Sequence, residues 1–199
     1  MKEQRDTMRL DQIKGNVHVK RALEVAAVIH APVTLLSRSN MLDALAFAAW
    51  ESSTMPITIV TPCPCGNFLS DTYACTCTPD AIREHQHQHA RYYMEDNLYI
   101  EVTLPKYEDF TNRSQETDER IGERITQARV FFHQVSSDMD TASQQLMKTA
   151  IQQFGGLSSI GYTCIITRAK AIAALAESSQ IRVAHLAESL QYVPRIHTP

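Results

Sequence analysis

The feature that most constrains this chain is a cluster of four cysteines in a short stretch rich in proline. They form two Cys-x-Cys pairs with nine residues between them: Cys63 and Cys65, then Cys75 and Cys77. Zinc binds four thiolates at the corners of a tetrahedron, with each sulfur about 2.3 Å from the metal. Two such pairs on one loop can fold back on each other and supply that geometry. The spacing therefore predicts a zinc site within the loop 61–79.

Two disulfide bonds, or free thiols in a loop, are the alternative interpretations of the same cysteines. The N-terminal segment is charged and contains no apolar run, so it does not resemble a secretory signal. No stretch of about 18 apolar residues occurs, so we expect no membrane contact. We expect a cytoplasmic protein, whose thiols stay reduced, and this favours metal ligation. Because protein fills all four positions, we expect the zinc to be structural and not to activate water.

Length and charge narrow the class of protein further. The 199 residues are enough for one α/β domain and a small helical domain, and 44% of them are hydrophobic, which allows a packed core. Lys and Arg number 19 against 22 Asp and Glu, a net charge of −3. This balance excludes a strongly basic protein that binds nucleic acid over its whole surface, although a local basic patch stays possible.

The order of apolar patterns in the first half predicts a parallel sheet. Residues 17–30 have helical spacing, 33–36 form a short strand-like run, and 41–51 fit a second helix capped by Asn40. The β-branched run 57–60 then predicts a buried strand. Helices that alternate with strands are typical of parallel sheets with crossover helices.

The pattern changes near Pro105, where we place a domain boundary. A histidine-rich helix over 80–91 and a strand over 98–104 precede it. Beyond it the sequence predicts only helices, over 118–134, 141–154, 158–176 and 183–190. The expected domains are thus a shortened α/β core over 1–105, which carries the zinc loop, and a helical lid over 106–199.

For three histidines and a fifth cysteine, we prefer a structural explanation to a role in metal binding or catalysis. His85, His87 and His89 alternate with glutamine, and the first and last lie one helical turn apart, where they could share a metal. No third ligand accompanies them, so we expect a solvated polar helix face. Cys164 lies beside Ile165 in an apolar stripe and is predicted to be a buried core thiol.

Four segments together resemble a known family. They read DQIKGNVHVKRALEVAA (11–27), TPCPCGNFLSDTYACTCTP (61–79), YIEVTLPKYED (99–109) and IRVAHLAESLQY (181–192). They resemble the magnesium-chelatase-like AAA+ ATPases, and the double cysteine pair resembles the ComM-like (competence protein) branch in particular, because the magnesium-chelatase I subunit lacks it. The resemblance implies a truncated AAA+-like parallel-sheet core with a zinc loop, followed by an all-α lid.

The sequence differs from that family at the positions of the residues that bind and hydrolyse ATP. The place of the phosphate loop, 35–41, has no glycine and no lysine, and Arg38 alone offers a cation there. No acidic strand for Mg²⁺ remains, and the polar sensor asparagine is Thr61. One family arginine is replaced by an acid within 94–98, and a second by Ile160. We therefore expect no catalytic residue, no ATP hydrolysis, and ATP binding that is weak at best.

The resemblance and its departures together predict a non-hydrolysing assembly or adaptor module in a DNA-related or ring-ATPase context. Its expected partner is another protein or further copies of itself, and DNA is a possible partner by resemblance only. The alternative is an ATP-binding ATPase subunit with a divergent or shared nucleotide site. A third interpretation is a degraded remnant of the family, with no selected activity beyond folding. The complete set of four cysteines argues against it.

Overall fold

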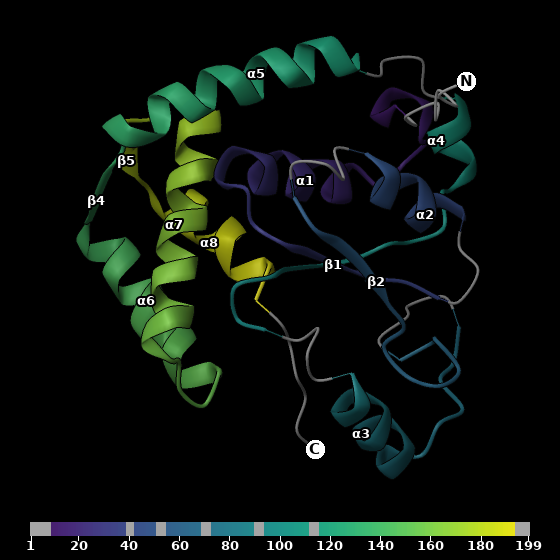
Figure 1. The fold of residues 1–199 in the computed structure, drawn as a ribbon. Coiled ribbons are helices and arrows are strands. Elements are labelled where there is room, and N and C mark those ends of the chain that lie inside the picture. Colours follow the sequence, from purple (N-terminus) through teal and green to yellow (C-terminus); the bar gives the residue numbers. More distant parts are fainter. Residues whose placement is uncertain are drawn as a thin grey trace.

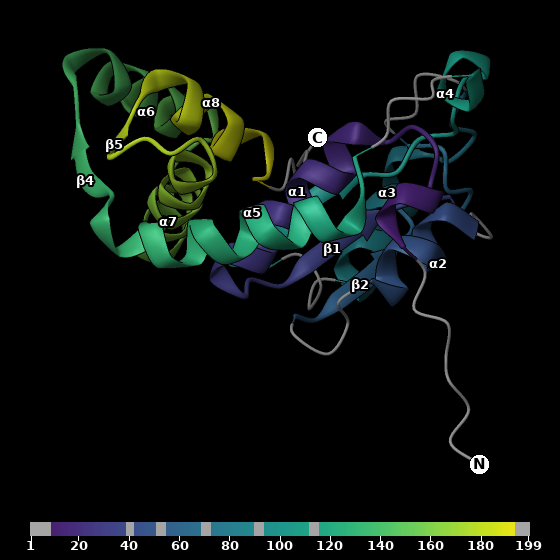
Figure 2. The same cartoon turned by 90° about the horizontal axis from the view of Figure 1, so that it is seen from above.

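The computed structural model describes residues 9–38, 42–50, 55–68, 73–89, 94–111 and 116–193. Within these ranges the protein is a mixed α/β fold, mostly helical, with small parallel sheets (Figures 1 and 2). None of the helices in these ranges is long and apolar enough to cross a membrane. The predicted fold class is thus confirmed at the level of a mixed α/β protein.

The main sheet has three parallel strands, β1 (Val33–Leu36), β2 (Ile57–Val60) and β3 (Leu98–Glu101). Their order is β2-β1-β3, so the first strand in sequence lies in the centre. Val33 pairs in register with a residue on each neighbour. Short β-branched and apolar runs favour strands buried in this way. The two predicted strands 33–36 and 57–60 are confirmed.

Three helices accompany this sheet: α1 (Val17–Ile29), α2 (Leu42–Ala49) and α3 (Pro79–Gln88). The crossovers through α2 and α3 connect β1 to β2 and β2 to β3, as expected for parallel strands. No side chain of α3 is buried, and this helix extends away from the sheet (Figure 1). The predicted cap at Asn40 and the predicted helix ends at Met41, Glu51 and Arg91 lie outside the described residues.

The C-terminal part contains four longer helices, α5 (Asp118–Phe131), α6 (Thr141–Gln153), α7 (Ser159–Leu175) and α8 (Val183–Gln191). Two of them, α6 and α7, begin at a capping side chain: the Asp140 carboxylate accepts a hydrogen bond from the Ser143 backbone at 2.7 Å. Ser158 likewise accepts one from the Gly161 backbone at 3.0 Å. All four helices predicted beyond Pro105 are therefore confirmed.

The prediction that only helices follow Pro105 is wrong. Strands β4 (Ser136–Met139) and β5 (Gln180–Ile181) form a second, parallel two-stranded sheet. They follow the ends of α5 and α7, and the Ser136 backbone donates to the Ser179 carbonyl at 2.8 Å. Strands this short carry no period-two pattern, so the sequence gives no sign of them. A short helix, α4 (Tyr107–Thr111), was also not predicted, nor were the 3-10 turns η1 (Leu10–Gln12) and η3 (Phe132–Gln134).

One hydrophobic core runs through both halves of the chain. It includes buried residues of α1 and β1 together with those of α5, α7 and α8. Nine of the 17 residues of α7 are buried, more than in any other described helix, which makes this helix the centre of the C-terminal half. The proposed division at Pro105 stays a prediction, since the core continues across it.

An ion-pair cluster reinforces the contact between α1 and α5. Arg124 donates two hydrogen bonds to the carboxylate of Glu24, at 2.8 and 3.1 Å, and two more to Glu116, at 2.6 and 2.8 Å. Glu24 is only 6% exposed, so its charge depends on this partner. Hydrogen bonding to both carboxylates raises the pKa of Arg124.

A second buried arginine ties α7 to the segment before β3. Arg168 is 1% exposed, and its Nη2 donates to the carbonyl oxygens of Glu95, at 2.7 Å, and Asn97, at 2.9 Å. Burial lowers the pKa of this guanidinium. The buried guanidinium thus supplies hydrogen bonds to two backbone carbonyls of this half-buried segment.

We predict that Arg168→Ala lowers the free energy of unfolding by about 2–4 kcal/mol, because it leaves a cavity in place of a fully buried side chain and removes two hydrogen bonds. Urea denaturation measures the change. Lys148→Ala on the exposed face of α6 is the control and should change stability by less than about 0.5 kcal/mol. An equal effect of both substitutions contradicts the assigned role of Arg168.

Candidate metal centre

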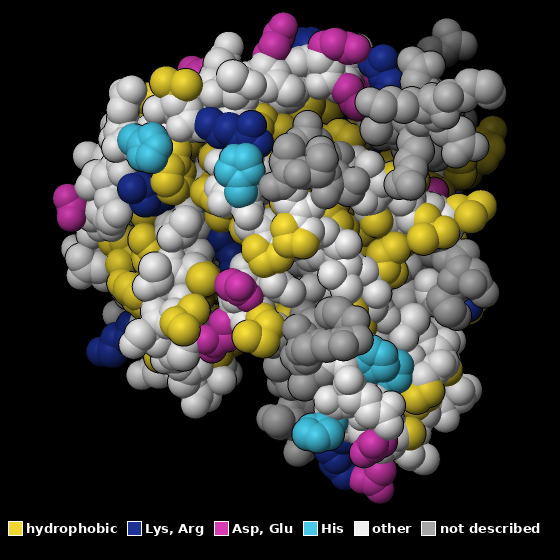
Figure 3. Space-filling model, viewed as in Figure 1, with side chains coloured by type: hydrophobic (Ala, Val, Ile, Leu, Met, Phe, Trp, Pro, Cys, Tyr) yellow, Lys and Arg dark blue, Asp and Glu magenta, His cyan; other side chains and the backbone are white. Residues whose placement is uncertain are grey.

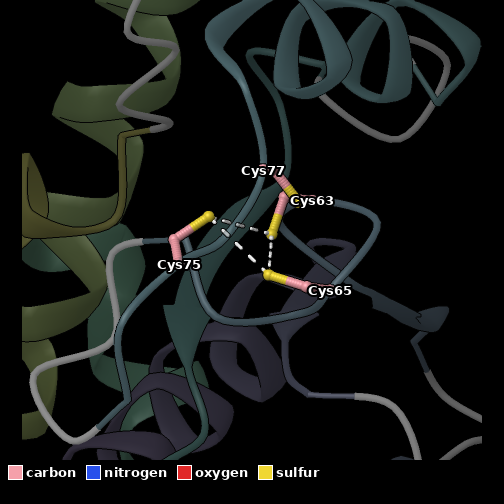
Figure 4. Close-up of side chains that lie close together, drawn as sticks. All are labelled: Cys63, Cys65, Cys75 and Cys77. Carbon is pink, nitrogen blue, oxygen red and sulfur yellow. Dashed lines mark hydrogen bonds between the residues drawn. The ribbon is translucent and has the colours of Figure 1, made fainter.

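The four predicted cysteines come together in space. Their sulfur atoms all lie within 4.8 Å of one another, and they form the one group of three or more His, Cys, Asp or Glu side chains with this spacing in the described ranges. Figure 4 shows Cys63, Cys65 and Cys75 pointing toward a shared centre, with Cys77 beside them. The arrangement can hold a metal ion.

The distances between sulfurs agree with those around a tetrahedral zinc ion. Cys63 and Cys65 are separated by 3.4 Å between sulfurs, Cys63 and Cys75 by 3.8 Å, and Cys65 and Cys75 by 3.7 Å. A tetrahedron with metal–sulfur bonds of about 2.3 Å has edges of about 3.8 Å. A disulfide needs sulfurs about 2.05 Å apart, and all five cysteines of the chain are unpaired.

The first cysteine pair is positioned by a turn that follows β2 directly. Cys63 is fully buried, and the Gly66 backbone donates to its carbonyl at 2.9 Å. Gly66 has φ of 76°, a left-handed conformation that glycine adopts without a steric penalty. The Phe68 backbone N–H then donates to the Cys63 sulfur at 3.3 Å. Such a bond stabilises a thiolate and orients it toward the centre.

The second cysteine pair leads directly into α3. Thr78 caps this helix by accepting a hydrogen bond from the Ala81 backbone at 3.2 Å, and Pro79 occupies the first turn. His85 on α3 contacts the start of the same loop, with its Nε2 2.9 Å from the Thr61 carbonyl oxygen. Both ends of the loop 61–79 are thereby fixed next to the sulfurs.

The thiols of the cluster do not share negative charge equally. Backbone hydrogen bonds from Thr76 and Asn67 lower the pKa of Cys65 to about 5. A backbone hydrogen bond from Cys65 favours the thiolate of Cys77, but burial and the neighbouring thiols outweigh it and raise the pKa of Cys77 to about 12. The same opposing causes raise the pKa of Cys75. A low pKa at Cys65 beside raised values at Cys75 and Cys77 is expected, because several negative charges at this distance would repel one another.

Among the described residues, the histidines of α3 belong to no group of three or more possible metal ligands. The rings of His85 and His89 lie tilted with centroids 4.3 Å apart, and Nδ1 of His89 lies 2.8 Å from the His85 carbonyl oxygen. One nitrogen of each ring thus already contacts a backbone carbonyl, since Nε2 of His85 lies near the Thr61 oxygen. No described side chain of α3 is buried, which agrees with the prediction of a solvated polar face on this helix.

The prediction for Cys164 needs correction. Its side chain is half-buried and not part of the buried core, because α7 turns this position toward its edge. Burial still raises the pKa of this thiol, which makes it a weak nucleophile.

The residues after β1, where the resemblance would place a phosphate loop, make defined contacts with the rest of the protein. After β1, the Ser37 backbone N–H donates to the Val60 carbonyl at 3.0 Å and thus continues the sheet. The Arg38 guanidinium lies 3.9 Å above the ring centroid of Tyr73, a residue of the cysteine loop. Sequence reasoning missed this contact, since nothing local relates residues 38 and 73. The rest of the segment, 39–41, lies outside the described residues.

The sequence matches no model of a known protein family. It matches no curated protein either. The likeness to magnesium-chelatase-like ATPases therefore depends on the short segments quoted above and stays a prediction about ancestry.

We predict that the purified protein contains about one zinc per chain and that Cys75→Ser lowers this content several-fold, because the ion loses one of its four ligands. The variant should also be cleaved faster by protease within the loop 61–79. Elemental analysis and limited proteolysis measure both effects. Cys164→Ser is the matched control and should keep full zinc content. Less than about a tenth of an equivalent of metal in the unmodified protein contradicts the metal site.

We predict that zinc affinity rises with pH. Zinc binds thiolates, so protons must leave the cysteines, among them Cys75 and Cys77, whose pKa is raised. Each proton released changes the affinity about tenfold per pH unit. These two protons alone give an expected slope of at least about a hundredfold per unit near neutrality. Competition with a chromophoric chelator at several pH values measures it, and an affinity independent of pH contradicts thiolate ligation.

Proposed function

We propose that this protein is a non-hydrolysing assembly or adaptor module derived from magnesium-chelatase-like AAA+ ATPases of the ComM-like branch, with a structural zinc ion in its cysteine loop. The observation that carries the proposal is the gathering of four sulfurs within 4.8 Å of one another in the segment with the most specific resemblance. A site with four protein ligands holds a fold together and leaves no position for substrate or water.

The position of β1 supports descent from a nucleotide-binding fold. Phosphate loops follow a strand and precede a helix, and here the central strand β1 is followed by α2 in the same order. A functional loop turns its backbone N–H groups toward phosphate. Instead, the Ser37 N–H bonds to Val60, and Arg38 stacks on Tyr73. The Ser37 N–H and the Arg38 guanidinium therefore both interact with other residues of the protein.

The contacts around the start of α7 support loss of catalysis in the same way. The family would supply an arginine near Ile160 and another within 94–98. Ile160 is 67% exposed, and the Glu95 carboxylate contacts the hydroxyl of the capping residue Ser158. An acid therefore lies at a helix N-terminus where a phosphate could bind. This arrangement repels a nucleotide and stabilises the helix.

The partner that we propose is a protein, either a competent ring ATPase or further copies of this chain. The shortened sheet leaves β2 at an edge, and large apolar side chains such as Leu42 and Tyr107 are exposed. Exposed apolar residues of this kind are typical of protein interaction surfaces when they cluster. A DNA context follows from the resemblance alone.

We predict no ATP hydrolysis above background and no saturable ATP binding below millimolar concentration, because the segment 35–41 contains neither glycine nor lysine and the sequence retains no acidic strand for Mg²⁺. Steady-state phosphate release and isothermal titration with Mg-ATP measure these quantities on zinc-loaded protein. Arg38→Ala serves as the matched variant. ATPase activity that this substitution removes would refute the proposal and favour a divergent nucleotide site.

A further inference from the structure

The four residues of the cysteine cluster differ in their access to solvent. Cys63 is fully buried, and its sulfur accepts a hydrogen bond from the Phe68 backbone N–H at 3.3 Å. Cys65, Cys75 and Cys77 are half-buried. A small solute can therefore reach the cluster at these three residues, whereas the loop encloses the fourth. Cysteine sulfur is oxidised where it is a thiolate and is accessible to the oxidant.

Two of the accessible sulfurs are close enough to react with each other. The sulfurs of Cys65 and Cys75 are 3.7 Å apart. A disulfide bond is about 2.05 Å long, so the two sulfurs have to approach by about 1.7 Å. Rotation of the two side chains can cover this distance without a change in the backbone. The geometry therefore allows a disulfide bond that connects the two Cys-x-Cys pairs.

A bond between the pairs is favoured over a bond within either pair. One residue separates Cys63 from Cys65, so a disulfide between them closes a very small ring, and strain makes such a bond easily reduced. The same holds for Cys75 and Cys77. Cys65 and Cys75 have nine residues between them, and their sulfurs already point toward a shared centre (Figure 4). The other short contact between the pairs, from Cys63 to Cys75 at 3.8 Å, involves a fully buried residue.

Hydrogen peroxide is an oxidant that suits half-buried sulfurs, because it is small and uncharged. One of the two sulfurs attacks the peroxide: an S–O bond forms, the O–O bond breaks, and the leaving hydroxide takes up a proton to become water. The second sulfur then attacks the first: the S–S bond forms, the S–O bond breaks, and a second hydroxide leaves and is protonated. The two sulfurs together lose two electrons, which the peroxide gains. Two thiolates, one peroxide and two protons thus give one disulfide and two waters.

This disulfide removes two of the four ligands that a metal ion would have in the cluster. Cys63 and Cys77 alone leave half of a tetrahedral site unfilled, so zinc dissociates. The helix α3 begins two residues after Cys77, which makes this cysteine its anchor to the cluster. No side chain of α3 is buried, and histidine and charged side chains lie on its projecting surface (Figures 1 and 3). The helix therefore has little packing of its own to hold it once the metal has left.

We propose that the cysteine cluster is a site of reversible modification by peroxide, at which a disulfide between Cys65 and Cys75 opens the cluster, expels its zinc and frees α3 from the loop. The proposal rests on the proposed function for the presence of zinc and goes beyond it by assigning a reaction to the same loop. A dithiol reduces the bond by thiol–disulfide exchange and restores the four thiolates. Cys164 lies on α7, outside the group of close sulfurs, and takes no part in the reaction.

Titration of the zinc-loaded full chain with hydrogen peroxide tests the proposal. A chromophoric chelator reports zinc release, and mass spectrometry of peptides from the alkylated protein maps the disulfide. We expect about one zinc released per peroxide consumed, a bond between Cys65 and Cys75, and renewed zinc binding after a dithiol is added. Hydrogen exchange of backbone amides should become at least about tenfold faster in α3 and stay unchanged in α7, whose residues form part of the core.

Three variants serve as controls. Cys164→Ser should release zinc as the unmodified protein does. Cys77→Ser and Cys75→Ser each remove one ligand from the same pair, so they are compared without metal: peroxide should form the bond between the pairs in Cys77→Ser and not in Cys75→Ser.

Zinc that stays bound in about a tenfold excess of peroxide, a disulfide between other cysteines, sulfinic acid in place of a disulfide, or unchanged exchange in α3 would each overturn the proposal. Absence of zinc from the purified protein refutes the metal site of the proposed function instead, and mapping of the disulfide in that protein still decides whether Cys65 and Cys75 react with each other.

Discussion

The structure depends on the close approach of four cysteine sulfurs within 4.8 Å of one another. Thiolates at this separation repel, and a divalent cation would offset that charge, so we expect metal binding and ordering of the loop to be coupled. The loop leads into the start of α3, and through Tyr73 it contacts Arg38 after the end of β1. The cysteine cluster thus connects the sheet to a helix with no buried side chain of its own.

The remainder of the fold is held by packing that does not involve the metal. The continuous core joins the sheet, through α1, to the helices of the C-terminal half. Buried Arg168 and the pair of Arg124 with Glu24 fix the orientation of these helices. The packing of the helical half therefore does not involve the cysteine loop, whereas the projecting loop is organised around the four sulfurs.

Much of this arrangement follows from local sequence, and the exceptions have physical causes. Helical periodicity predicts α5 to α8, because a repeating apolar stripe is required wherever a helix covers a core. The cysteine spacing predicts the sulfur cluster, because only a folded-back loop satisfies four ligands. Strands β4 and β5 could not be predicted, since pairing of so few residues depends on where two helices end. The half-buried position of Cys164 depends likewise on the rotation of α7, which an apolar stripe in the sequence does not fix. The contact between Arg38 and Tyr73 is a tertiary feature that no local pattern encodes.

The central claim is that the four sulfurs hold one zinc ion with no other ligand. Zinc X-ray absorption spectroscopy of the protein purified under reducing conditions tests it most directly. The account predicts four sulfur neighbours at about 2.3 Å and no nitrogen or oxygen neighbour. A first shell that contains nitrogen or oxygen near 2.0 Å, or fewer than four sulfurs, would contradict a closed structural site formed by Cys63, Cys65, Cys75 and Cys77.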